Sequence, residues 1–477
     1  ESGGVDPEPD TQQLYDGAVV GEPFGDLDPQ TALAEVRLRQ LGGTTNHWAG
    51  FCRPLDPVDF EVQDRPGPSG WPFGPDELEP WYRGAGEVLG LPGDAFAWSD
   101  WSAPTGVDDP LADTDLVRTG AYLVRPVRFG EAFRADLESS PDIDVILHAN
   151  LVGLTFDGDV VTAARAATLE GDEVVVEASS FVLALGGIEN ARMLLALDRG
   201  DGTAGIGNEN DLVGRFFCEH PQAIMGVATV AADPDQLRTV FESGVPLGDG
   251  PEPVPVARGV LVASEEAARQ RGLLSFGVQA LAGAIDTDAP VAVRGLDARD
   301  IAVYEETSQG IDAAGVLYLL VTGEQLLHRE SRVSLGEDRD ALGIRRAVVD
   351  WRLTAEDRAG MLDALRLVGR ELGRLGLGRV QLAPGNLVRA EEGGFEIDPD
   401  EADPERFQPG IGFHHLCTTR MADDPAQGVV DADLRVHSVD NLYVLGSSSF
   451  ATAGSAPPTL TIVALALRLA DRLAVGP

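Results

Sequence analysis

The sequence contains no lysine, so all 36 basic residues are arginines, and they stand against 78 aspartates and glutamates for a formal net charge of −42. A field this negative repels nucleic acid and anionic membranes, which excludes partners of both kinds. The acidic residues are spread through the whole chain and fit either an ordinary acidic protein or one adapted to molar salt. In molar salt a Debye length of ~3 Å screens neighbouring carboxylates from one another. We expect the salt-adapted protein, because a GC-rich genome replaces lysine by arginine without adding acids.

Cysteines and histidines are also scarce. The three cysteines, Cys52, Cys218 and Cys417, form neither a disulfide framework nor a metal-ligand motif, and the seven histidines form no zinc motif. The cysteines therefore predict buried thiols in a reducing compartment. The absence of a ligand motif among the cysteines and histidines predicts no metal site. The longest apolar runs, such as AGVLYLLV and TIVALAL, fall short of the ~20 residues that cross a bilayer. We therefore expect no membrane span, and we favour the cytoplasm of a high-salt organism.

The chain has 477 residues, of which 43% are hydrophobic, enough for two or three domains with a real core. The stretch SFVLALGGIENARMLLALD predicts a buried strand, a Gly186–Gly187 turn and a helix, the unit of a doubly wound sheet. NLYVLGSSSF and PPTLTIVALALRLADRLA near the end predict a second such unit, with proline at the helix start. Residues 143–156, IDVILHANLVGLTF, are predicted as a strand.

Residues 222–350 are rich in predicted strands with Gly and Pro turns, which indicates a second domain on a mainly antiparallel sheet. Its strands include SRVSLG and RRAVVDWRL. An amphipathic helix follows and ends at Gly376. The predicted fold class is α/β (α+β overall), with a Rossmann-like doubly wound domain, discontinuous in sequence, and a second domain on an antiparallel sheet with flanking helices.

The first residues, ESGG, are typical of a strand tip in a dinucleotide fold, where an acidic residue binds the ribose hydroxyls. The G-x-G-x-x-G fingerprint that precedes such an acid is missing, since GIGNEN and GRLGLG do not fit it. If Glu1 binds ribose, the glycine loop lies before residue 1. The alternative is that Glu1 is an arbitrary starting point.

Seven stretches in fixed order then carry a resemblance. They are ESGG, LGGTTNHWAG, SGWP, VLALGGIENARMLL, VGRFFCEHP, HHLCTTRMADDPAQGVVDADLRVHSVDNLYVLGSSSF and PPTLTIVALALRLAD. Over essentially its whole length the chain resembles the glucose-methanol-choline flavin oxidoreductases. The His47–Trp48 pair is similar to the sugar-oxidising branch, which includes pyranose oxidases, C-glycoside oxidases and fructose dehydrogenase subunits.

The resemblance implies bound FAD and a division of the chain into alternating parts. FAD-binding parts are expected at 1–70, 141–221 and 410–477, a substrate-side insertion at 71–140, and a substrate-binding domain at 222–409. Because the likeness begins within a motif, we expect the first strand and glycine loop to come from residues before Glu1 or from another chain. A leader peptide therefore stays open.

The segment at 42–49 would lie against the flavin. Gly42 and Gly43 would let the backbone approach the ring system, and the polar residues after them would hydrogen-bond the cofactor. His47 has two roles open to it, as the covalent carrier of FAD or as a packed neighbour of the ring. The cofactor-binding positions that the resemblance implies are Glu1, Gly42, Gly43, Thr44, Thr45, Asn46, His47, Trp48, Ala49, Ile146, Gly186, Gly187, Gly446, Ser447, Thr459 and Leu460.

Alcohol oxidation needs a base near the hydroxyl, and histidine has a suitable pKa. In FHHLCTT, His414 aligns with the family's catalytic histidine, and His415 is the competing choice. Where the family has His or Asn before the last Pro-Thr, this chain has Pro457, which offers no donor. The second catalytic group must then come from elsewhere, with His415 one candidate, or the activity is altered.

The sequence thus predicts an FAD-dependent oxidoreductase that oxidises a CH–OH group of a sugar, glycoside or polyol. Two alternatives stay open: a flavin dehydrogenase of a steroid or other apolar alcohol, and an inactive or repurposed homologue or subunit. The expected partners are the substrate and an electron acceptor, which is oxygen, a quinone or a redox protein. A homo-oligomer or a partner redox subunit is also open.

Overall fold

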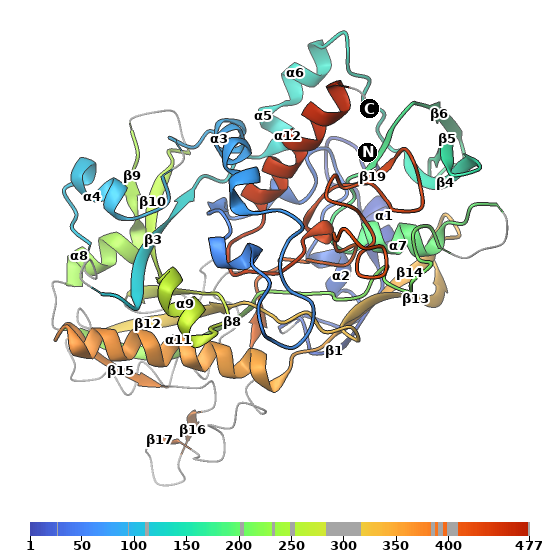
Figure 1. Cartoon of the computed structure of the whole chain (residues 1–477). Coiled ribbons are helices and arrows are strands. Elements are labelled where there is room, and N and C mark those ends of the chain that lie inside the picture. The colour runs from blue at the N-terminus through green and yellow to red at the C-terminus, as the bar shows by residue number, and fades with distance from the viewer. Residues whose placement is uncertain are drawn as a thin grey trace.

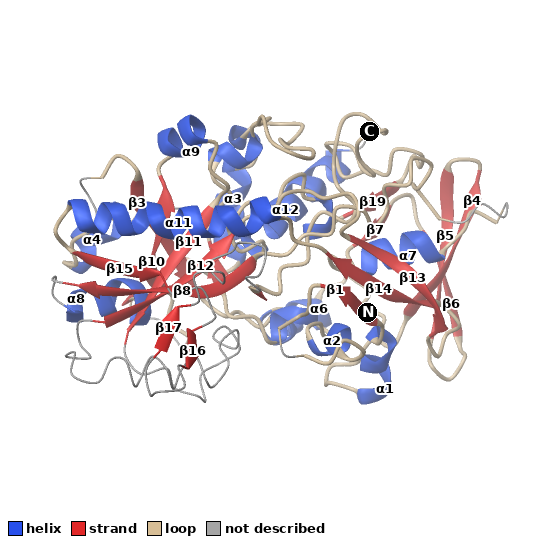
Figure 2. Cartoon of the chain, turned by 90° about the horizontal axis from the view of Figure 1, so that it is seen from below, coloured by secondary structure: helices blue, strands red, loops and turns tan. Residues whose placement is uncertain are grey.

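The computed structural model describes all residues except 26, 94, 110–113, 201–204, 231–233, 249–252, 283–315, 383–386, 390–394, 398–408 and 476–477. The elements form two halves that lie side by side (Figure 2). One half contains a large sheet, and the other contains several small sheets with their helices (Figures 1 and 2). One hydrophobic core cluster runs through elements of both halves.

The large sheet has nine strands in the order β15-β8-β12-β11-β10-β3-β2, with β18 beside β8 and β9 beside β10. Each of its pairs is antiparallel, as the sequence predicts for the second domain. The strands are β2 Phe51–Cys52, β3 Val117–Val124, β8 Pro221–Val230, β9 Val245–Pro246, β10 Val256–Ala263, β11 Phe276–Ala282, β12 Val316–Gly323, β15 Gly378–Leu382 and β18 Gly410–Ile411.

The long helix α11, Ala355–Arg374, runs along this sheet (Figure 2). It begins with a capping box in which Thr354 and Asp357 bond each other's backbone N–H groups. It ends before Gly376, whose φ of +68° is the left-handed conformation that glycine adopts readily. Both ends follow local signals, and the predicted helix is confirmed.

The other half contains the two predicted strand–turn–helix units. Strand β7, Phe181–Leu183, pairs in parallel with β19, Leu442–Val444. β7 leads through the Gly186–Gly187 turn into α7, Glu189–Ala196. β19 leads into a turn at Gly446 and then, through the rest of the loop 445–458, into α12, Thr459–Val475. Both turns lie at the carboxyl ends of parallel strands, where such sheets place their ligands.

The predicted strand at 143–156 is wrong in its first half. Strand β4, Asn150–Asp157, begins seven residues later and forms a meander with β5 Val160–Ala167 and β6 Glu173–Glu177. His148 interrupts the extended chain with a φ of +56°. Ile146 therefore lies outside any strand, although its carbonyl accepts a hydrogen bond of 2.9 Å from the Glu1 amino group.

Two strands of the predicted second domain lie in the other half. Strand β14, Arg345–Trp351, pairs in parallel with β1, Ala18–Gly21, and antiparallel with β13, Arg332–Arg339. The alternating pattern of SRVSLG and RRAVVDWRL predicts strands but carries no information about the partner. The sheet to which they belong is decided by packing against a segment about 330 residues earlier.

The remaining helices and strands are short. They are α1 Pro9–Gln12, α2 Ala32–Glu35, α3 Glu79–Val88, α4 Ser99–Thr105, α5 Phe129–Ala132, α6 Arg134–Ser139, α8 Pro234–Arg238, α9 Glu265–Arg271, β16 Leu387–Arg389 and β17 Phe395–Ile397. Within the described part of the chain, no helix has the length and hydrophobicity needed to cross a membrane. Cys52, Cys218 and Cys417 are buried free thiols, as predicted.

Candidate active site

Two segments far apart in sequence run beside each other at the edge of the large sheet. β18 pairs with the start of β8, and the backbones of Cys218 and Leu416 exchange hydrogen bonds of 3.1 and 2.9 Å. Between these contacts the Gly412 N–H donates to the His220 carbonyl at 2.9 Å. This pairing brings the side chains of His220 and His414 together, with 2.9 Å between their Nδ1 atoms.

The two adjacent histidines of FHHLCTT have different surroundings. His414 is half-buried, whereas His415 is 8% exposed and stacks against Phe24 and Phe217 at ring-centroid distances of 5.9 and 6.0 Å. Burial lowers the pKa of His415 to about 3, with Arg37 adding to the effect. Burial, with the neighbouring His220 and His415, also lowers the pKa of His414 well below its usual value. Both rings are neutral at neutral pH, and His414 is the more accessible.

Glu219 lies against the backbone of His220 and His414 and is fully buried. Its Oε2 accepts hydrogen bonds from the backbone N–H groups of His414 at 2.9 Å and His220 at 3.2 Å. Its Oε1 lies 3.4 Å from the Nε2 of His415, and neither atom has a hydrogen-bond partner among the described residues. Burial raises the pKa of Glu219 to about 8 despite the N–H groups that favour the carboxylate.

The turns after β7 and β19 hold the histidine segment from the other side. A Cβ on Gly187 would lie 2.1 Å from the His415 carbonyl oxygen, so glycine is required for this contact. The Ser447 hydroxyl donates to the same carbonyl at 2.7 Å. Thr418 donates to the Gly187 carbonyl. Both turns that the sequence assigns to the cofactor therefore contact residues 415–418.

Asn190 joins these two turns. It is fully buried, accepts a hydrogen bond from the Leu185 N–H at 2.9 Å, and donates to the Leu445 carbonyl at 3.1 Å and to Ser448 at 2.9 Å. Gly446 lies next to it with a φ of +133°. Asn190 thereby fixes the spacing of the two strand ends.

The loop before α12 completes the surroundings of His220. The Ala453 carbonyl lies 3.2 Å from the His220 Nε2, and Arg53 donates to Ser455 at 3.4 Å. Pro457 is half-buried in this loop. Thr459 and Leu460 open α12, with Leu460 fully buried. Position 457, before Pro-Thr, thus carries no polar side chain. The imidazole beside His414 comes instead from His220.

The glycine-rich segment at 42–49 forms a short 3₁₀ turn, Gly43–Asn46. Its polar side chains bond to the chain itself: Thr44 accepts from the Leu38 N–H at 3.2 Å, Thr45 donates to the Gly42 carbonyl, and Asn46 donates to the Leu41 carbonyl at 2.8 Å. Trp48 donates to the Val127 carbonyl at 2.8 Å. His47 and Ala49 follow this turn with exposed side chains. The predicted bonds of this segment to a cofactor stay predictions.

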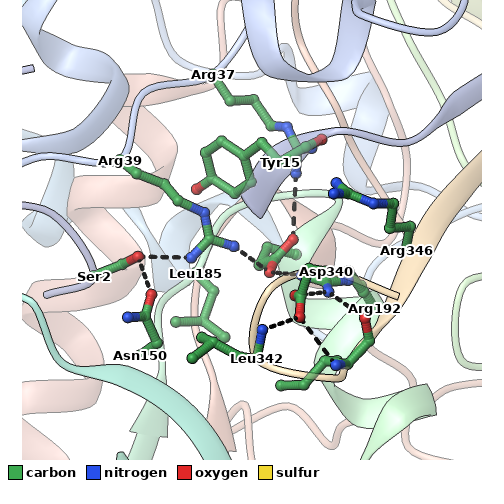
Figure 3. A network of polar contacts seen from close by, with 12 residues as sticks. Ser2, Tyr15, Arg37, Arg39, Asn150, Leu185, Arg192, Asp340, Leu342 and Arg346 are labelled. Carbon is green, nitrogen blue, oxygen red and sulfur yellow. Dashed lines mark hydrogen bonds and ion pairs between the residues drawn. The ribbon is translucent and has the colours of Figure 1, made fainter. Parts of the chain in front are cut away.

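A buried ionic network contacts Ser2, the residue after Glu1 (Figure 3). Arg39 donates to Glu189 at 2.6 Å and to Ser2 at 2.7 Å, and Arg192 also binds Glu189. Burial alone would raise the pKa of Glu189, but the arginines Arg39, Arg192 and Arg37 together hold it below its usual value. The network ties the start of the chain to α7.

The residues present fit a large planar cofactor lying against the backbone. Gly43 and Gly186 have φ values of +54° and +92°, and no atom lies within 4 Å of where a Cβ would be. Both backbones are therefore open to close approach. Beside the first of them, the buried Oε1 of Gln40 has no hydrogen-bond partner within the described part of the chain.

Comparisons with known proteins agree with this geometry. The family model described as GMC oxidoreductase matches residues 328–466. The fructose dehydrogenase large subunit of Gluconobacter japonicus is 25% identical, over 93% of this chain and 82% of its own length. At residues 328–466 the chain therefore resembles the GMC oxidoreductases. Together with the relatives, this similarity supports an FAD-dependent oxidoreductase.

Two further proteins extend the comparison. The 2-methyl-1,2-propanediol dehydrogenase of Mycolicibacterium austroafricanum is 25% identical, over 91% of this chain and 80% of its own. The crystal structure of pyridoxine 4-oxidase from Mesorbium loti superposes with a TM-score of 0.58 at 19% identity, over 100% of this chain and 94% of its own. The fold of that structure thus spans the whole chain.

Sequence reasoning missed Glu219, His220 and Asn190. The first two lie in VGRFFCEHP, which supports the family resemblance, yet nothing local connects that stretch with His414, 194 residues away. Asn190 lies in VLALGGIENARMLL and also has its partners in a distant turn. A buried polar residue within a family motif is the signal that could have identified all three.

Proposed function

We propose that this protein oxidises a CH–OH group of a sugar, glycoside or polyol, with His414 as the base. The observation that carries the proposal is the half-buried, neutral imidazole of His414, held beside the two turns of the nucleotide-binding half. Bound FAD supplies the hydride acceptor.

The substrate class follows from the relatives. One is named for fructose and another for 2-methyl-1,2-propanediol, and both compounds carry neighbouring oxygen-bearing carbons. The His47–Trp48 pair supports the sugar-oxidising branch.

In this proposal the two adjacent histidines have separate roles: His415 anchors the segment and His414 is the base. His415 is stacked and buried, and its carbonyl is bonded by Ser447, so it anchors the segment. His414 is the residue that takes the hydroxyl proton. Gly43 and Gly186 would lie against FAD, with Glu1 toward its ribose.

The test is anaerobic mixing of the FAD-bound enzyme with sugars, polyols and apolar alcohols while the flavin absorbance is recorded. We expect reduction by a polyhydroxylated substrate, and reduction only by apolar alcohols would contradict the substrate class. The absence of reduction by every substrate would favour the inactive homologue. Admitting oxygen or a quinone afterwards identifies the acceptor, and acid denaturation shows whether the flavin stays attached to the protein, as a covalent bond through His47 requires.

The role of His414 has its own variant. His414→Ala should retain FAD but slow flavin reduction by ~10² or more. His437→Gln is the matched control, because His437 also bonds a backbone carbonyl, that of Ala422 at 2.9 Å. Because the pKa of His414 is lowered and Glu219 beside it stays mostly protonated below its pKa of about 8, the wild-type rate should stay constant from pH 7 to pH 6. A native rate in His414→Ala would refute the assignment.

A further inference from the structure

The short contact between the Nδ1 atoms of His220 and His414 requires that one of these nitrogens carries a proton and the other does not. Their Nδ1 atoms are 2.9 Å apart and the rings are nearly perpendicular, at 82°. Two lone pairs would repel at this distance, and so would two N–H groups. One ring must donate through Nδ1 and the other must accept.

The Ala453 carbonyl decides which ring donates. It lies 3.2 Å from the Nε2 of His220, and a carbonyl oxygen can only accept. The Nε2 of His220 therefore carries a proton. Burial lowers the pKa of His220 to about 4, so at neutral pH the ring holds no second proton. Its Nδ1 is a lone pair, and the proton in the contact belongs to His414.

A neutral His414 with its proton on Nδ1 has a free lone pair on Nε2. The backbone keeps the ring in this contact, because the His414 N–H is bonded to Glu219 and the neighbouring Gly412 is bonded to the His220 carbonyl. A Cβ on residue 412 would lie 3.1 Å from the His414 Nδ1, so glycine leaves the room that the pair needs.

We propose that His220 is a positioning residue that holds His414 in the tautomer whose Nε2 is the base. Its bond to the Ala453 carbonyl keeps the His220 proton on Nε2, so the His220 Nδ1 accepts from His414. This inference rests on the proposed role of His414. When the substrate O–H bond breaks, the proton moves to Nε2 and the electron pair stays on the substrate oxygen. His414 is then an imidazolium, and its Nδ1–H still donates to the lone pair of His220, which stabilises the new charge.

This arrangement accounts for the departure at Pro457. That residue offers no side-chain donor or acceptor. The imidazole of His220, immediately before β8, takes the place of a second polar group beside His414. The other charged groups acting on His220 are Glu324 and Arg53, with opposite effects on its pKa.

Two replacements of His220 separate its two contacts. The carboxamide of His220→Asn reaches the place of Nδ1 and can accept from His414. The carboxamide of His220→Gln reaches the place of Nε2, so it keeps the bond to Ala453 and loses the acceptor. We expect flavin reduction ~10² slower in His220→Gln, less than ~10-fold slower in His220→Asn, and unchanged in the His437→Gln control.

A second measurement does not depend on activity. In the oxidised, FAD-bound enzyme labelled with ¹⁵N-histidine, the His414 signal, assigned by its loss in His414→Gln, should report a protonated Nδ1 and an unprotonated Nε2. His220→Gln should shift His414 toward the other tautomer.

The outcomes separate the two proposals. A native His414 protonated at Nε2 overturns the tautomer inference whatever the rates are, and this reading is decisive even if His220→Gln fails to fold. Equal slowing in both His220 variants would indicate only a packing role and also overturns it. A protonated Nδ1 together with a native rate in His414→Ala would instead retain the tautomer and refute the base.

Discussion

Replacing Glu219 by glutamine should make the protein markedly more resistant to alkaline conditions. The carboxyl group is fully buried, and among the described residues only its Oε2 has hydrogen-bond donors. Glutamine has the same shape and keeps an oxygen for these two N–H groups. Its amide nitrogen can take the place of the carboxyl Oε1, on the side of His415 Nε2, which has no hydrogen-bond partner among the described residues. The substitution therefore imitates the protonated form of Glu219.

The size of the effect follows from the pKa of Glu219. Burial raises it from 4.5 to about 8, so between these pH values the folded protein keeps a proton that the unfolded chain releases. The stabilisation is complete below pH 4.5 and is lost as pH rises through 8. Each tenfold change in proton affinity is worth ~1.4 kcal/mol, so the full loss is about 5 kcal/mol. The glutamine variant cannot ionise and avoids it.

The assay is urea unfolding in molar KCl at pH 5, 7 and 9. The unfolding free energies of the wild type and Glu219→Gln should nearly coincide at pH 5 and differ by several kcal/mol at pH 9. Glu177→Gln, on the exposed strand β6, removes one negative charge without burial and should show no such divergence. Parallel curves for the wild type and Glu219→Gln would refute the reasoning.

Two further predictions concern salt and packing. With a net charge of −42, we expect the unfolding midpoint to rise steeply from dilute buffer to molar KCl, because salt screens the repulsion between carboxylates; a flat profile would exclude adaptation to high salt. Gly187→Ala should destabilise the fold by ~1–3 kcal/mol and slow flavin reduction, because the new Cβ would meet the His415 carbonyl at 2.1 Å. Gly74→Ala, where no atom lies within 4 Å of the added Cβ, is the control, and equal stability of the two variants would contradict the packing argument.

Elements with local signals could be predicted from the sequence. The apolar run at 181–185, the Gly186–Gly187 turn and α7 follow one another as expected, and α11 ends before Gly376. In each case the information lies within about 20 residues: a buried run, a residue that tolerates positive φ, and an apolar period of helical spacing. The family motifs extended this reading to FAD and to His414.

The order of residues therefore establishes the kinds of elements and the chemistry available to them. Which elements meet depends on how the chain packs. It paired β14 with β1 rather than with the large sheet, started β4 at Asn150 because His148 turns the chain, and brought His220 against His414. The physical reason is that hydrogen bonding and burial reward contact between any two compatible segments, and a local pattern does not record the partner. The same holds for the proton of His414, whose position depends on a carbonyl of Ala453 that no side-chain pattern reveals.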